Sequence, residues 1–88
     1  MYYVYILFCS DRRLYIGFTT DVRKRLTAHK TGAVPSTKRR QPVKLVYFET
    51  YCNGQDAKAR EVFLKSGAGH KQLKHQHKRM FEKLGYMK

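Results

Sequence analysis

The stretch "YYVYILFCSDRRLYIG", residues 2–17, places two runs of strand-forming residues on either side of a short polar turn. Tyr, Val, Ile and Phe dominate the runs Tyr2 to Cys9 and Leu14 to Phe18, so the stretch predicts a β-hairpin. Val or Ile would form these strands equally well, whereas Tyr adds a hydroxyl that needs a partner. The tyrosines therefore indicate a surface used for binding or chemistry, although strand propensity alone is a sufficient alternative explanation.

The register of the hairpin decides where Tyr5 and Tyr15 lie. Side chains alternate between the two faces of a strand, so a two-residue turn would place these tyrosines on opposite faces. An odd loop, or one bulge, groups them on one face with Tyr3 and Gly17. We predict the odd register, with the tyrosine face as the active site and Gly17 leaving space for substrate or for Arg25. The other face is then apolar: Val4, Ile6, Phe8, Leu14, Ile16 and Phe18.

The charge balance points to a polyanionic partner. The chain has 19 Lys and Arg against 6 Asp and Glu, a formal net charge of +13 on 88 residues. Such a surface attracts phosphate backbones, and nucleic acid is the usual partner. Ribosomal proteins and acidic-lipid binders share this composition, but the sequence lacks a helix with a basic face opposite a large apolar face.

Length and cysteine content restrict the class further. Eighty-eight residues predict one domain, residues 1–88. Cys9 and Cys52 could form only one bridge, and the longest apolar stretch is too short to cross a bilayer. We therefore expect a reduced, cytoplasmic protein with no membrane partner, and the oligomeric state stays open, a monomer included.

Downstream of the hairpin, the pattern predicts a helix that begins near Asp21, is capped by one of the two threonines before it, and ends at Gly32. Residues 34–42, "VPSTKRRQP", are expected to form a basic loop. Residues 43–51, "VKLVYFETY", predict a third strand whose near-continuous apolar run suits a central or doubly covered position.

The last third of the chain predicts two helices. The first runs from Ala57 to Ser66 with Asp56 as its cap, and "SGAG" at 66–69 separates it from the second. The expected inward faces are Ala59, Val62 and Phe63 in the first helix and Leu73, Met80, Phe81 and Leu84 in the second. The order ββαβαα gives an α/β fold of the α+β type, a small three-stranded, mainly antiparallel sheet flanked by helices.

Several motifs in order carry a family resemblance. "YVY" at 3–5 is followed after nine residues by "YIG" at 15–17, then by Arg25 and His29 on the next helix and by "ARE" at 59–61. This arrangement resembles the GIY-YIG nuclease superfamily, and within it the short stand-alone bacterial members. The resemblance covers about residues 2–65. Tyr3 replaces the usual glycine of the first motif, and the asparagine that some members carry after the glutamate is missing.

The resemblance implies an endonuclease that hydrolyses DNA phosphodiester bonds with Mg²⁺ or Mn²⁺, with RNA as an open second substrate. It implies that Tyr5 and Tyr15 are the functional tyrosines, that Arg25 braces the scissile phosphate, and that His29 assists. Glu61 would bind the metal. A tyrosine of ordinary pKa about 10 is a poor base, but the charges of arginine and metal are expected to lower that pKa. DNA contacts are expected from Gly17, Arg23, Lys24, Lys38, Arg39 and Arg40.

Other interpretations stay open for each of these residues. Glu61 and Arg25 could be surface side chains, and His29 fits a packing role nearly as well as a catalytic one. His75 and His77 lie two apart, so on a helix they point away from each other and are expected to be solvated. The main alternative function is a nucleic-acid-binding module with this fold and little or no catalysis. A basic RNA-binding or ribosome-associated protein is a weaker alternative, since no aromatic RNA-binding motif is present.

Overall fold

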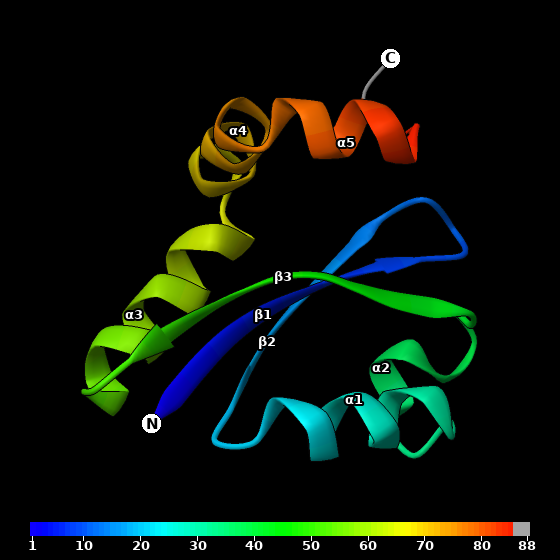
Figure 1. Cartoon of the computed structure of the whole chain (residues 1–88), viewed down its shortest axis with the longest axis horizontal. Coiled ribbons are helices and arrows are strands. Elements are labelled where there is room, and N and C mark those ends of the chain that lie inside the picture. The colour runs from blue at the N-terminus through cyan, green and yellow to red at the C-terminus, as the bar shows by residue number, and fades with distance from the viewer. Residues whose placement is uncertain (86–88) are drawn as a thin grey trace.

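The computed structural model describes residues 1–85 and contains a three-stranded antiparallel sheet in the order β2-β1-β3 (Figure 1). The strands are β1 (Tyr2–Cys9), β2 (Leu14–Thr19) and β3 (Val43–Tyr51). The predicted α+β class and the three strands are confirmed. The expected central position of β3 is wrong, because β1 is the middle strand and its residues 4–7 are buried in an unbroken run on both faces.

The hairpin has the odd register. Cys9 N–H donates to Arg13 O at 3.0 Å and Arg12 N–H to Cys9 O at 2.9 Å, which closes a three-residue loop, residues 10–12. Arg12 takes the left-handed conformation at φ 64°, as the last residue of such loops commonly does. Tyr5 pairs with Gly17 and Leu7 with Tyr15, so Tyr5 and Tyr15 share a face. This prediction is confirmed.

The helices are α1 (Val22–Lys30), α2 (Pro35–Lys38), α3 (Gly54–Lys65), α4 (Gly67–Gln76) and α5 (Lys78–Leu84). The observed order is therefore ββααβααα rather than ββαβαα. Asp21 itself caps α1, accepting Lys24 N–H at 3.0 Å. The expected basic loop contains α2, a single turn that begins at Pro35, where a fixed φ suits a helix start.

The expected face and cap of α3 are wrong. Asn53, not Asp56, caps the helix by accepting two backbone N–H groups. Val62 is 62% exposed and Phe63 37% exposed, and Ala59 is exposed as well. The buried stripe is Ala57, Glu61 and Leu64. It contains a carboxylate, so a search for apolar periodicity does not find it.

The last segment also differs in detail from its prediction. α4 starts at Gly67, so only Ser66 separates it from α3, and the expected long helix breaks at His77. Leu73 and Phe81 are buried as expected, and Met80 and Leu84 are partly buried against them. Within residues 1–85, no helix has the length and apolar character needed to cross a bilayer.

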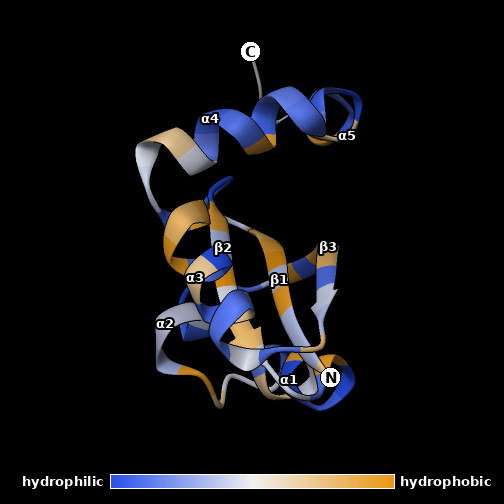
Figure 2. Ribbon diagram, turned by 90° about the vertical axis from the view of Figure 1, so that its left-hand side faces the viewer, coloured by the Kyte–Doolittle hydropathy of each residue, from blue (hydrophilic) through white to orange (hydrophobic). Residues whose placement is uncertain are grey.

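Helices cover both faces of the sheet. Figure 1 shows α4 and α5 on one side of the sheet and α1 and α2 on the other, with α3 beside the strands. In Figure 2 the strand β1 is coloured largely hydrophobic and α4 and α5 largely hydrophilic. Two buried clusters match this arrangement. One consists of Val4, Ile6, Ile16, Ala57, Leu64, Leu73 and Phe81, and the other of Tyr5, Leu7, Cys9 and Val43.

A partly buried ion pair links α3 to the edge strand β3. Arg60 donates to both carboxylate oxygens of Glu49 at 3.0 Å each. Tyr47 and Tyr51 donate their hydroxyls to the same carboxylate at 2.8 and 2.6 Å. Two charge-assisted hydrogen bonds therefore link the helix to the strand, and the two tyrosines, which belong to β3 themselves, hold the carboxylate in place.

Candidate active site

Tyr5 stands at the centre of the tyrosine face. It lies on the middle strand, and its side chain is 2% exposed. Its hydroxyl oxygen is 2.7 Å from His29 Nε2, and Arg25 Nε donates to the same oxygen at 3.4 Å. A side chain predicted from the first motif thus contacts two side chains predicted from the following helix.

α1 presents Arg25 and His29 to the sheet because they lie four residues apart, one above the other on a helix. His29 is fully buried. Its second ring nitrogen, Nδ1, lies 2.7 Å from Oγ1 of Thr37, which is also fully buried and comes from α2. Thr37 was not predicted, since a threonine within "STKRR" gives no signal until α2 is placed against α1.

The protons in this chain of hydrogen bonds have one consistent arrangement. Burial raises the pKa of Tyr5, and the hydrogen bond from Arg25 does not offset it. Burial, with the Arg25 charge, lowers the pKa of His29. Near neutral pH the phenol therefore keeps its proton and the imidazole is uncharged. Tyr5 O–H donates to Nε2, and Nδ1–H donates to Thr37.

The charge of Arg25 alone therefore does not give the expected lowering of the Tyr5 pKa, and the part of that expectation that rests on a metal ion stays a prediction. The expectation weighed the arginine charge but not the burial of the ring on the central strand, which disfavours the phenolate. Tyr5 is a phenol until something else stabilises its charged form.

Tyr15 and Gly17 complete the face from β2. The Tyr15 ring centroid lies 5.0 Å from that of His29 and 6.3 Å from that of Tyr5. Gly17 pairs with Tyr5, and a Cβ built at this position would lie 2.3 Å from Cζ and Oη of the tyrosine. The space that glycine leaves is filled by Tyr5, not by substrate or by Arg25 as expected.

Glu61 reaches the site from the other layer, on α3. It is 6% exposed, and its two carboxylate oxygens accept from Lys58 at 2.8 Å and from Lys65 at 3.0 Å. Burial alone would raise the pKa of Glu61, but the two lysines outweigh it and hold the pKa below its usual value. The Glu61 charge contributes to the raised pKa of Tyr5, so the two side chains are within electrostatic reach.

A divalent cation would find one carboxylate here. Among residues 1–85 no group of three or more His, Cys, Asp or Glu side chains could form an all-protein metal cage. Mg²⁺ is often bound by one or two carboxylates, with water and substrate phosphate as the remaining ligands, and Glu61 fits that arrangement. The lysines that hold its oxygens are 62% and 56% exposed and can move into solvent.

The six residues expected to contact DNA have different environments. Arg23 and Lys24 on α1 and Lys38 and Arg39 at α2 are exposed. Arg40 instead donates to Asp11 at 2.8 Å and to the Leu14 carbonyl at 3.4 Å, which ties the α2 segment to the hairpin. Gly17 is buried beneath the tyrosine ring. The exposed cations are thus carried by α1 and α2, the helices that also carry Arg25, His29 and Thr37.

Comparison with known proteins identifies the family of the chain. The GIY-YIG catalytic domain profile matches residues 1–79. A UPF0213 protein of Clostridium perfringens is 48% identical over 66 residues, which cover 74% of this chain and 71% of that protein. A UPF0213 protein of Haloquadratum walsbyi is 46% identical over 66 residues, 74% of each chain. The solution NMR structure of a UPF0213 protein from Bacillus halodurans has a TM-score of 0.56 at 34% identity, covering 88% of this chain and 86% of that one. The chain therefore belongs to the GIY-YIG family, which is part of a nuclease superfamily.

Proposed function

We propose that the protein is a metal-dependent endonuclease that hydrolyses DNA phosphodiester bonds at the Tyr5 cluster. The observation that carries the proposal is the pair of contacts at one buried hydroxyl: His29 Nε2 at 2.7 Å and Arg25 Nε at 3.4 Å. Strand propensity explains why Tyr5 is on a strand, but it does not explain a guanidinium and an imidazole directed at the phenol.

The arrangement suits Tyr5 as a base that acts together with His29. The raised pKa of Tyr5 and the lowered pKa of His29 oppose this transfer in the free protein. When the substrate complex stabilises the charged pair, the Tyr5 proton would move to Nε2 along the existing hydrogen bond and leave a phenolate beside Arg25 and an imidazolium whose Nδ1–H still donates to Thr37. The phenolate can then accept the proton of the attacking water. Tyr15 packs against His29 and keeps the ring in place.

Charge on the phosphate has to be balanced by the remaining groups. The Arg25 guanidinium is planar and can donate two parallel hydrogen bonds to phosphate oxygens. Glu61 is the residue that would hold Mg²⁺ or Mn²⁺, and the metal ion, when bound, would neutralise negative charge at the phosphate. Lys58 and Lys65 would be released from Glu61 by that binding and add positive charge nearby.

The partner follows from charge as well as from the site. The exposed cations Arg23, Lys24, Lys38 and Arg39 lie on or beside α1 and α2, the helices that cover the tyrosine face of the sheet. Contacts of this kind neutralise backbone phosphates without reading sequence. We include RNA as a second substrate class, because phosphate contacts alone do not distinguish the two.

The alternative is a nucleic-acid-binding module that retains the fold without cutting. It is favoured by the two lysines that occupy the Glu61 carboxylate and by Tyr3 in place of the first motif glycine. In that case Lys58, Glu61 and Lys65 form a structural ion network on the surface of α3.

The two functions predict different results for Glu61→Gln and Arg25→Lys. If the site is catalytic, each substitution should slow cleavage by about 10²-fold or more, because one loses the metal-binding charge and the other the forked geometry. DNA binding should survive both. Asp56→Asn, on the same helix as Glu61, and Arg13→Lys, directly after the hairpin loop, are matched controls and should cut like wild type.

The assay incubates each protein with linear, nicked and branched DNA in Mg²⁺ or Mn²⁺, with EDTA as the blank. Wild-type cleavage that needs metal and is lost in Glu61→Gln supports the proposal. Cleavage by Glu61→Gln at the wild-type rate would show that the catalytic assignment is wrong, and no cleavage by wild type on any geometry would favour the binding module.

A further inference from the structure

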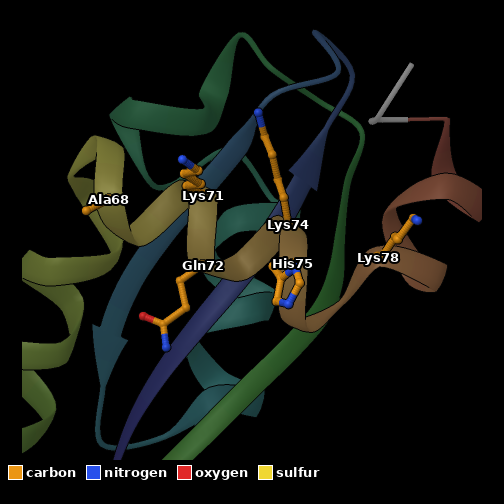
Figure 3. A pocket seen from close by; sticks show the side chains of 6 residues that line it. All are labelled: Ala68, Lys71, Gln72, Lys74, His75 and Lys78. Carbon is orange, nitrogen blue, oxygen red and sulfur yellow. The ribbon is translucent and has the colours of Figure 1, made fainter.

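A stripe of cationic and polar side chains runs along the outer side of α4 and α5. Lys71, Lys74 and His75 follow an i, i+3, i+4 spacing on one face of α4, and Lys78 begins α5 after the break at His77. Figure 3 shows them projecting from α4 and the start of α5 around a shallow hollow. We call this surface the α4–α5 basic face, defined by the residues that line the hollow: Ala68, Lys71, Gln72, Lys74, His75 and Lys78.

The inward side of the same helices explains why this stripe faces outward. Leu73 and Phe81 are fully buried and pack with Val4, Ile6 and Ile16 on the apolar face of the sheet. On most helices the residues three and four positions apart that share a face are apolar and pack on the core. On this face of α4 they include lysines, which point away from the core. Burial of the opposite side is therefore sufficient to hold the stripe in place, and no ligand is needed for folding.

The charge on this surface is one-sided. Residues 67–85 contain five Lys and Arg and a single acid, Glu82. The carboxylates that neutralise cations elsewhere, Asp11, Glu49 and Glu61, all belong to other elements. No acidic side chain is among the residues that line the hollow. Lysines gathered on one surface without an acidic side chain among its lining residues repel one another in the isolated protein and attract a polyanion.

The position of the α4–α5 basic face relative to the Tyr5 cluster limits what one nucleic acid can do. Val4 and Ile6 direct their side chains to one face of β1 and Tyr5 to the other, so the sheet separates the two surfaces. The molecule measures 35 × 29 × 18 Å. DNA is stiff over about 150 base pairs, so a duplex lying along one face cannot fold back within the length of this protein to reach the other.

We propose that the α4–α5 basic face binds the phosphate backbone of a second duplex segment, so that one protein molecule holds two segments on opposite sides of its sheet. The proposal rests on nucleic acid as the partner in the proposed function, and it narrows the substrate class to branched or paired duplexes. An acidic membrane surface is a poorer match, because a helix that binds membranes exposes an apolar face and these helices bury theirs.

The test compares two variants that each lose two positive charges. Lys71→Ala/Lys78→Ala removes cations from the α4–α5 basic face, whereas Arg13→Ala/Lys44→Ala removes exposed cations from the hairpin end of the molecule. Binding is measured without metal, so that nothing is cut. On a branched duplex, the first variant should flatten the plot of log affinity against log salt by about 1.8 units if each lysine meets one phosphate, and the second should leave the slope unchanged.

A bridging assay asks whether one molecule holds two segments. Two short duplexes, one labelled with a fluorescence donor and one with an acceptor, are mixed with protein, and the mass of the complex is measured by light scattering. Wild type should give energy transfer in a complex of one protein and two duplexes. Lys71→Ala/Lys78→Ala should keep one duplex and lose the transfer, with an unchanged melting temperature.

Three results would overturn the proposal. In the first, wild type binds only a single duplex. In the second, energy transfer survives in Lys71→Ala/Lys78→Ala because two protein copies bridge the duplexes. In the third, the α4–α5 basic face binds phosphatidylserine vesicles but not duplexes. Failure of the proposed catalysis is a separate outcome. Wild type that bridges duplexes but never cuts them with metal refutes the nuclease and leaves the second surface standing.

Discussion

Gly17→Ala is the substitution for which the structure predicts the most specific effect. A Cβ at this position would lie 2.3 Å from Cζ and Oη of Tyr5 and 2.7 Å from Cε1. Non-bonded carbon atoms approach to about 3.5 Å, so the tip of the ring has to move by about 1.2 Å. The tip of an exposed tyrosine could do so cheaply, but this ring is 2% exposed and its hydroxyl is held by His29 and Arg25.

The cost has two parts. Overpacking a well-filled interior costs about 1–3 kcal/mol, and loss of the hydrogen bond to His29 adds about 1 kcal/mol. For a chain of 88 residues, the sum of about 2–4 kcal/mol should lower the melting temperature by at least about 8 °C. If the site is catalytic, displacement of the hydroxyl by about 1 Å should also reduce cleavage by roughly 10²-fold.

A control and a double substitution identify the cause. Gly67 begins α4, and a Cβ there meets nothing within 4 Å, so Gly67→Ala should be neutral or slightly stabilising. Tyr5→Leu removes the atoms that collide, so Gly17→Ala should cost less than about 1 kcal/mol in that background. Thermal melts of the wild type, the three single variants and the double variant suffice. An equal cost of Gly17→Ala with and without Tyr5→Leu would refute the steric argument.

Three further predictions concern hydrogen bonds of the buried residues His29 and Thr37 and of the partly buried Glu49. Burial lowers the pKa of His29 below the unfolded value of about 6.5. The contribution of His29 to the free energy of unfolding is therefore complete above that pH and is lost as the pH falls through the folded pKa. Denaturant unfolding at pH 7.5 and 5.5 should show this loss of stability, and the loss should be smaller in His29→Gln. Thr37→Val leaves the Nδ1–H of His29 without its acceptor and should cost about 1–3 kcal/mol, whereas Thr37→Ser should restore most of the stability and the imidazole nitrogen chemical shifts. Glu49→Gln weakens the hydrogen bonds between α3 and β3 and should lower the free energy of unfolding by about 3 kcal/mol. Burial and the Glu49 carboxylate raise the pKa of Tyr47 and of Tyr51 to about 12. An ultraviolet titration of the variant should therefore show two phenols that ionise at lower pH than in wild type.

The hairpin and its register could be predicted because side chains alternate between the two faces of a regular strand. Once Tyr5 and Tyr15 are required to share a face, the loop must be odd, and the three-residue loop satisfies this. The place of β3 could not be found in the same way. Its run of apolar letters resembles a central strand, but Lys44, Phe48 and Thr50 are exposed, and burial of a strand on both faces depends on which helices cover it.

The site residues on α1 were predictable for a similar reason, since a helical spacing of four fixes Arg25 and His29 on one side. Thr37 was not, because its contact with His29 requires α2, a single turn, to pack beneath α1. The ion pair between Arg40 and Asp11 likewise joins residues that are 29 positions apart in the sequence. Such contacts are set by tertiary structure, and a sequence pattern of short period does not contain them.

The arrangement at Glu61 explains how one carboxylate can remain charged where burial opposes it. Burial alone would raise the pKa of this glutamate, and the ammonium groups of Lys58 and Lys65 instead hold that pKa below its usual value. The same lysines compete with any divalent cation for the carboxylate oxygens, since a cation has to displace both hydrogen bonds before it gains two ligand atoms. One carboxylate with such competitors binds a metal weakly on its own. Phosphate oxygens of a bound nucleic acid would supply further ligands and attract the released ammonium groups, so metal binding and substrate binding at this site should strengthen each other.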